Sequence, residues 1–117
     1  MGCLAVHHDG QFWFGRRPNK GLWAGLWELP TATFKKTPTT KDIQQHFGLK
    51  NKKLGVIRHV LTHRIVHLAV FVAEESNPIG PFHYSNFRAI RLNNLESLGT
   101  SSLTEKALTM AQDWTDM

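Results

Sequence analysis

This chain of 117 residues, 41% of them hydrophobic and 20% charged, is long enough to form one domain with a core of its own. It has no run of about 18 apolar residues, which excludes a membrane-spanning helix, and no basic-then-apolar start that would mark a secretory signal. Fourteen Lys and Arg against nine Asp and Glu give a net charge of +5, which suits a polyanionic partner such as nucleic acid.

Two short strands are predicted at residues 3–8 and 11–15. Asp9-Gly10 lies between them and predicts a two-residue hairpin turn, because such turns need the positive φ that Asp and Gly adopt readily. A basic loop is expected over residues 16–21, since its proline cannot continue a strand. Residues 26–29 alternate in polarity and predict a third strand, which the next proline ends.

A polar, threonine-rich connection leads to a helix predicted over residues 41–47. One of the two threonines at 39–40 is suited to cap its N-terminus, and Gly48 is suited to end it. Residues 50–53 are expected to form a basic turn before the next strand.

Residues 57–72 form the most apolar stretch, and their β-branched and aromatic side chains predict two buried strands. A short polar break at residues 61–64, Leu-Thr-His-Arg, separates these strands. Polar groups in such a stretch must be either paired or exposed. The break is therefore either an ordinary hairpin turn or a contact loop held on a rigid sheet, and composition alone does not decide between them.

Residues 74–84 predict a loop, residues 88–92 a last strand, and Asn93 or Asn94 a short turn. A final helix is expected to start at Ser101 or Ser102, where Ser102 with Glu105 matches the capping-box pattern. The order of three strands, a helix, three strands and a helix predicts an α+β domain over residues 1–117. Its mixed, mostly antiparallel sheet would be flanked by two helices.

This order of elements resembles the Nudix fold. Nudix hydrolases carry the signature G-x5-E-x7-R-E-U-x-E-E-x-G-U, where U is a bulky aliphatic residue, and its last nine positions fall on residues 41–49. The adjacent glutamates that hold the divalent metal fall on Gln45 and His46, and the upstream glutamate falls near Thr33. Because Mg²⁺ needs carboxylate oxygens, the resemblance implies the scaffold without its metal site. We predict no catalytic residue and no metal ligand in this chain.

Other chemistry finds less support. The chain has no phosphate-binding P-loop and no nucleophile elbow. His59, His63 and His67 share strand parity and could approach one another at a zinc ion, although no cysteine or carboxylate lies nearby in the sequence.

The polar break carries groups that suit DNA. Thr62-His63 offers a hydroxyl and an imidazole, and Leu61 could wedge against bases. The predicted contact residues are Arg58, His59, Leu61, Thr62, His63 and Arg64. Possible phosphate contacts are Arg16, Arg17, Lys20, Lys52 and Lys53.

Two segments resemble the C-terminal domain of adenine DNA glycosylases of the MutY family. One is residues 17–30, in which Arg-Pro leads to Gly-Leu-Trp-Ala-Gly-Leu-Trp-Glu-Leu-Pro, and the other is residues 58–63, Arg-His-Val-Leu-Thr-His. Residues 92–98 and the helix after them, with Thr-Glu-Lys-Ala-Leu, also look similar. The resemblance implies a domain that recognises 8-oxoguanine opposite adenine in duplex DNA during base excision repair.

The family's loop commonly reads Phe-Ser-His, which falls on Leu61-Thr62-His63. The resemblance implies that Thr62 contacts the oxidised base through its hydroxyl and backbone, with Leu61 packed beside it. His59 and His63 would hold the nearby backbone or the loop. Leucine cannot stack as phenylalanine does, so intercalation should be weaker, and the methyl group of threonine should tighten the pocket.

In that family, a separate N-terminal domain with a four-cysteine iron–sulfur cluster excises adenine. One cysteine, Cys3, cannot hold such a cluster, so we expect a monomeric, non-catalytic part of a longer protein, with no cofactor. Expected partners are duplex DNA with 8-oxoguanine:adenine mispairs and the N-terminal catalytic domain of the same protein, and not a membrane. The single cysteine fits a reducing setting, and the expected location is the bacterial cytoplasm, at the nucleoid.

Two alternatives stay open. The Nudix-like order also suits a divergent nucleotide pyrophosphohydrolase with unorthodox ligands that acts on oxidised nucleotides. The exposed aromatics would suit a protein-interaction domain.

Overall fold

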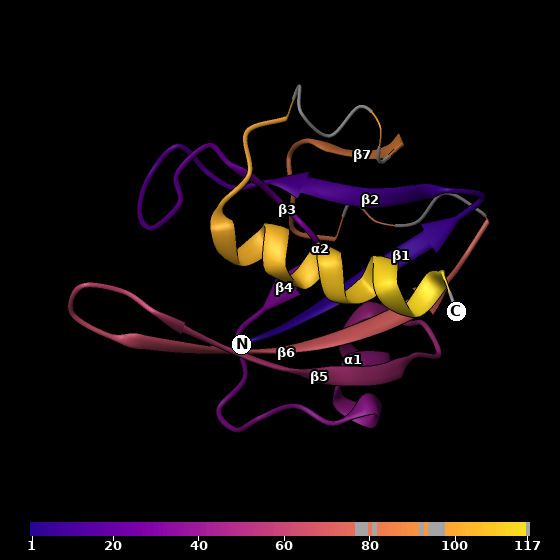
Figure 1. Ribbon diagram of the computed structural model, residues 1–117, viewed down its shortest axis with the longest axis horizontal. Coiled ribbons are helices and arrows are strands. Elements are labelled where there is room, and N and C mark those ends of the chain that lie inside the picture. The colour runs from indigo at the N-terminus through magenta and orange to yellow at the C-terminus, as the bar shows by residue number, and fades with distance from the viewer. Residues whose placement is uncertain (77–79, 81, 92, 94–97, 117) are drawn as a thin grey trace.

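The computed structural model describes residues 1–76, 80, 82–91, 93 and 98–116 of the chain (Figure 1). Its elements in chain order are β1 (Gly2–His8), β2 (Gln11–Arg16), β3 (Trp27–Glu28), β4 (Thr31–Ala32), α1 (Thr40–Phe47), β5 (Lys52–Val60), β6 (Ile65–Glu74), β7 (Phe87–Arg91) and α2 (Ser102–Thr115). They confirm the predicted α+β layout. No helix within this described part is long and apolar enough to cross a membrane.

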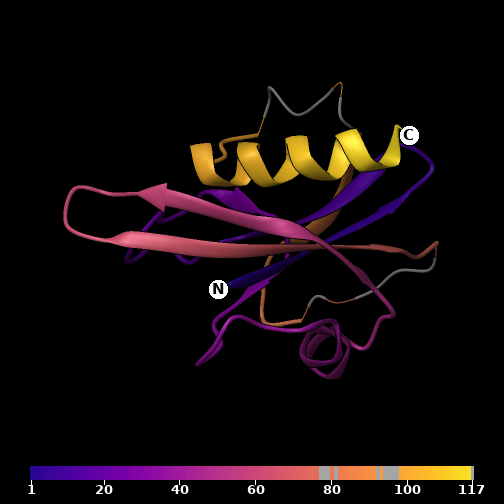
Figure 2. The same cartoon turned by 60° about the horizontal axis from the view of Figure 1, so that its bottom comes forward.

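One sheet contains all of these strands, in the order β3-β2-β1-β6-β5, with β4 paired to β1 and β7 paired to β2. β1 and β6 run parallel, and the other pairs are antiparallel. This central pair is covered on both faces, which is why β6 reads as a continuous apolar run. Figure 2 shows α2 and α1 on opposite sides of the sheet.

Each face of the sheet has its own hydrophobic core. α2 covers the larger core and buries Leu103 and Leu108 there, while α1 buries Ile43 and Phe47 in the smaller one. Full burial of one such side chain contributes roughly 1.5–3 kcal/mol. Cys3 lies in the larger core, where burial raises the pKa of its thiol to about 12. The thiol is therefore a core group and not a nucleophile at neutral pH.

Local sequence signals act as expected at the turn and at the first helix. Asp9 and Gly10 both have positive φ, 51° and 77°. The Thr39 hydroxyl accepts a hydrogen bond from the Asp42 backbone, and the Asp42 carboxylate accepts one from the Thr39 backbone, which completes a capping box. Gly48 ends α1 in the left-handed conformation.

Several predicted boundaries were wrong. Residues 50–53 do not form a turn, because β5 already begins at Lys52. The threonine-rich connection contains β4, which pairs with β1. α2 is capped by Ser101, whose hydroxyl accepts from the Thr104 backbone, and not by Ser102. Leu92 and residues 94–97, where a strand end and a turn were expected, lie outside the described residues.

β5 and β6 form a long antiparallel hairpin whose distal end extends beyond both helices (Figure 1). The last pair in its register is Val60 with Ile65, and these side chains are 61% and 46% exposed. The hairpin therefore projects residues 62–64 away from the body of the domain, while the strand pairing beneath holds them on a rigid support.

The ring of Tyr84 packs directly over Gly15 of β2. A Cβ atom at Gly15 would lie 2.3 Å from the ring, whereas a Cβ at Gly55 of β5 would meet the flexible Met110 side chain at 3.5 Å. We predict that Gly15→Ala lowers the free energy of unfolding by roughly 1–3 kcal/mol, because the ring must shift. Gly55→Ala is the matched control in urea titrations. Equal midpoints for the two variants would contradict the close packing.

Candidate nucleic-acid interface

The tip of the β5–β6 hairpin is the two-residue segment Thr62-His63. The Leu61 backbone N–H donates to the Arg64 carbonyl oxygen at 2.7 Å and closes the turn below these residues. Both tip side chains are exposed, and neither makes a hydrogen bond to any other described residue. The predicted break between two strands is confirmed, and its hydroxyl and imidazole are available for contact.

The predicted contact residues divide between the two faces of the hairpin. Leu61 is half-buried and packs against the core beneath α2, so only part of it is available as a wedge. His59 faces the same side. Arg58 alternates with it and lies on the α1 side, and Arg64 lines a groove on that side. Among these predicted contact residues, Thr62 and His63 lie at the tip, where the two faces of the hairpin meet.

His59 is held by residues distant in the sequence. Its Nδ1 lies 3.2 Å from Lys106 Nζ on α2, and its ring centroid lies 6.5 Å from that of Trp23. This arrangement supports a structural role beside the tip. Sequence reasoning missed Lys106, since 47 residues separate it from His59 and no local pattern joins them.

The structure does not bring His59, His63 and His67 together, as a zinc site would require. The hairpin register pairs His59 with Val66, so His67 projects to the opposite face, where it lines the groove on the α1 side. The turn at residues 61–64 reverses the parity that a continuous strand would have kept. Among the described residues, no three His, Cys, Asp or Glu side chains come close enough to hold a metal ion.

Arg17 belongs to a buried polar network. Its Nη1 lies 3.2 Å from Glu28 Oε1, and Tyr84 Oη donates to Glu28 Oε2 at 2.5 Å. The Tyr84 oxygen in turn accepts from the Thr31 backbone at 3.0 Å, and Arg17 Nε donates to the Leu22 carbonyl. Burial raises the pKa of Glu28, while the Tyr84 hydrogen bond and the Arg17 charge act against that rise. Arg17 therefore stabilises the fold through this ion pair and these hydrogen bonds.

The other predicted phosphate contacts fall into two groups, one at the basic loop that also holds Trp23 and one at the start of β5. Arg16 Nε donates to the Gly25 carbonyl at 2.9 Å, and Lys20 is exposed in the same loop. Lys52 lies 5.8 Å from the Trp114 ring centroid, at the opposite end of β5. With nine residues in β5, about 3.3 Å apart, Lys52 and Lys53 lie roughly 25 Å from the distal end. The structure does not bring them to the tip.

The four glutamate positions of the signature fall near Thr33 and on Asp42, Gln45 and His46, and two of them lie together. Thr33 and His46 line one cleft of about 280 Å³ with Arg17 and His83. Hydroxyl, imidazole and guanidinium groups do not supply the carboxylate oxygens that Mg²⁺ requires. The neighbouring carboxylate, Asp42, accepts a hydrogen bond from the Thr39 backbone, and this bond lowers its pKa. Asp42 is therefore part of the cap of α1. These residues do not fit a Mg²⁺ ion.

The sequence model of the NUDIX domain matches residues 2–110. The C-terminal domain of mouse MUTYH, solved in complex with human PCNA, is 18% identical over 98% of this chain and 88% of its own, with a TM-score of 0.73. The MutT NUDIX hydrolase of Burkholderia pseudomallei is 18% identical over 93% and 94%, with a TM-score of 0.69. The MutT protein of Methanosarcina mazei is 15% identical over 96% and 91%, with a TM-score of 0.71. None of the curated sequences matches significantly. These likenesses confirm the expected Nudix fold.

Burial of the Glu28 carboxyl group should make the stability of the protein depend on pH. A folded-state pKa above the ordinary value means that the folded protein holds this proton over a pH range in which the unfolded chain has lost it. The contribution of Glu28 to stability should therefore fall as pH rises through that range. We predict that raising the pH above the ordinary pKa of glutamate lowers the unfolding free energy of wild type relative to that of Glu28→Gln. Glu105→Gln, at an exposed position of α2, is the control. An equal shift in that variant would contradict the assignment of the effect to buried Glu28.

Proposed function

Because the chain belongs to the NUDIX domain family but carries no glutamate at the metal-binding positions of its signature, we propose that it is a non-catalytic DNA-recognition module. It reads 8-oxoguanine opposite adenine in duplex DNA, as the C-terminal domain of an adenine DNA glycosylase of the MutY family. The observation that carries this proposal is the exposed Thr62-His63 tip, projected by a long and rigid hairpin.

The chemistry of the tip supports the proposal. The Thr62 hydroxyl can donate and accept a hydrogen bond, and the His63 ring nitrogens can do the same. The closing bond between Leu61 and Arg64 fixes the backbone beneath them, so less backbone freedom is lost when DNA binds. Arg64 adds a cation next to the tip, where it can contact a phosphate.

The fold likeness to the mouse MUTYH domain also supports this proposal. Excision of adenine would be the task of the catalytic domain of the same protein, which holds the iron–sulfur cluster in that family. The mouse domain was solved bound to PCNA, so the proposal includes a protein partner in addition to DNA.

We predict that the chain binds an 8-oxoguanine:adenine duplex more tightly than a guanine:adenine duplex in fluorescence anisotropy. Thr62→Ala should reduce that preference about three- to tenfold, because one hydrogen bond to the lesion contributes roughly 1 kcal/mol. Thr109→Ala, an exposed threonine on α2, is the matched control and should keep the preference. Equal affinity of the wild-type chain for both duplexes would rule out lesion reading.

A nucleotide pyrophosphohydrolase remains the second candidate, favoured by the cleft that joins Thr33 and His46 and by the fold of the MutT proteins. The cavity beneath Trp23, on the other face, is only about 10 Å³ and can hold no more than one water molecule. We predict no Mg²⁺-dependent release of pyrophosphate from oxidised dGTP. Release that is abolished by Gln45→Ala or His46→Ala would replace the recognition module with a hydrolase.

A further inference from the structure

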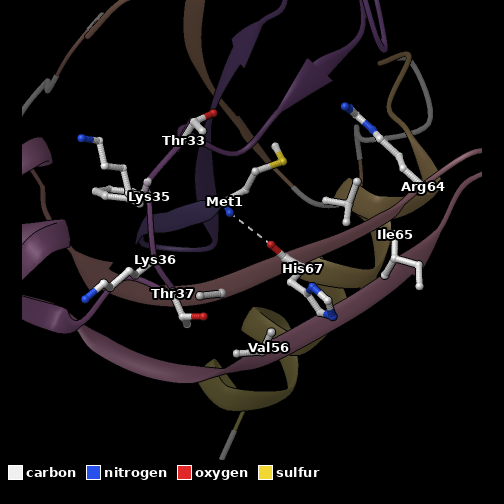
Figure 3. A pocket seen from close by; sticks show the side chains of 12 residues that line it. Met1, Thr33, Lys35, Lys36, Thr37, Val56, Arg64, Ile65 and His67 are labelled. Carbon is white, nitrogen blue, oxygen red and sulfur yellow. Dashed lines mark hydrogen bonds between the residues drawn. The ribbon is translucent and has the colours of Figure 1, made fainter.

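A groove of about 410 Å³ runs along the α1 side of the hairpin, between β5–β6 and the segment of residues 33–37 (Figure 3). α1 covers only the other end of this face, so the distal end of the hairpin has no helix packed on it (Figure 2). The groove adjoins the cleft that contains His46, with which it shares Met1 and Thr33. Leu61 does not line it, because its side chain packs against the larger core.

The hairpin side of the groove combines Arg64 and His67 with aliphatic side chains, among them Val56 and Ile65. Val60 follows Val56 and Arg58 on the same face of β5, beyond the lining residues. Val56, Val60 and Ile65 are 46%, 61% and 46% exposed, and they account for three of the four large exposed hydrophobic side chains in the described part of the chain. The fourth is Leu22, in the loop before β3. An exposed aliphatic strip of this kind on one strand pair indicates a contact surface.

Cations flank this strip on both sides. Figure 3 shows Lys35 and Lys36 on the segment of residues 33–37, and Arg64 on the other side, where β6 begins. Arg58 lies on the same face of β5 by strand alternation. None of the residues that line the groove is acidic, and none of its three Lys and Arg side chains takes part in an ion pair with a described residue. The groove therefore suits an anionic partner that also has apolar surface.

We propose that this groove binds the sugar–phosphate backbone of one DNA strand. Phosphates lie against Lys35, Lys36 and Arg64, and the apolar faces of deoxyribose pack on Val56 and Ile65. The strand is continuous with the one that the tip contacts, because Arg64 directly follows Thr62-His63 and also lines the groove. This inference rests on the proposed function for the identity of the partner, and it adds a second, sequence-independent surface to the lesion-reading tip.

The test compares two double variants of the whole chain that remove equal charge. Lys35→Ala with Lys36→Ala removes both lysines of the groove, while Lys41→Ala with Lys50→Ala removes two exposed lysines outside it, and each pair takes the net charge from +5 to +3. Binding is measured by anisotropy at several salt concentrations on both duplexes. The groove variant should reduce the slope of log K against log salt by nearly two, since each phosphate contact contributes about 0.9.

The aliphatic strip has its own matched pair. Val56→Thr with Ile65→Thr keeps β-branched side chains on the strands. It should weaken binding about fivefold, because less apolar surface is buried against the deoxyriboses, and it should leave the salt slope unchanged. Leu22→Thr, outside the groove, should leave binding unchanged. Thermal melts of all variants check that these exposed positions leave the fold intact.

The two proposals fail in different ways. If the two lysine pairs lower affinity and slope equally, the groove is not a strand site, while the lesion preference of the tip stands on its own result. If the groove variant weakens both duplexes by the same factor and Thr62→Ala has no effect, the groove holds and lesion reading fails. Displacement of DNA by a polyglutamate peptide as effectively as by unlabelled DNA would overturn the assignment to a sugar–phosphate backbone. Absence of binding to either duplex would overturn both.

Discussion

One buried carboxylate organises the middle of this domain. Glu28 is only 6% exposed, and a buried charge without partners costs several kcal/mol, so its neighbours must stay in place. Arg17 and Tyr84 meet its two oxygens, and Tyr84 continues the network to the backbone of Thr31. The network joins the first loop, the two short strands and the segment before β7. It also explains why β2 carries glycine where the Tyr84 ring passes over it.

The same network decides which cations are available to a partner. Arg17 is held by Glu28 and by a backbone carbonyl, and Arg16 by the Gly25 carbonyl, so the basic loop uses its arginines to hold itself. The cations without such partners in the described part of the chain include Lys35, Lys36 and Arg64, which flank the hairpin. The proposed DNA surface is consequently the hairpin, with the tip as the group-specific contact and the groove as the general one.

Helix α1 keeps the packing residues of the Nudix signature helix without its adjacent glutamates. Ile43 and Phe47 still bury one face of the helix, and Gly48 still ends it. Asp42 now caps the helix, and His46 meets Thr33 in a cleft that offers no carboxylate. The fold does not depend on glutamate at these positions, because Thr33, Gln45 and His46 are exposed, and the His46 ring packs on Phe47 instead.

The sequence alone determined the features that depend on neighbours along the chain. Asp9-Gly10, the Thr39 cap, Gly48 and the break at residues 61–64 are all set by contacts within about four residues, and the structure contains each of them. The order of helices and strands, apart from the two-residue β4, followed from the same local patterns. Together with the Leu-Pro and Gly-Leu endings, that order was sufficient to predict the α+β layout and the Nudix-like fold.

Only the tertiary structure decided which side chains meet. Tyr84 reaches Glu28 across 56 residues and Lys106 reaches His59 across 47, and no local pattern encodes either contact. The hairpin register placed His59 and His67 on opposite faces, which a parity count along one strand had put together. The groove likewise exists because segments 33–37 and 56–67 lie side by side. Such arrangements depend on strand register and on packing between layers, and both are properties of the whole sheet.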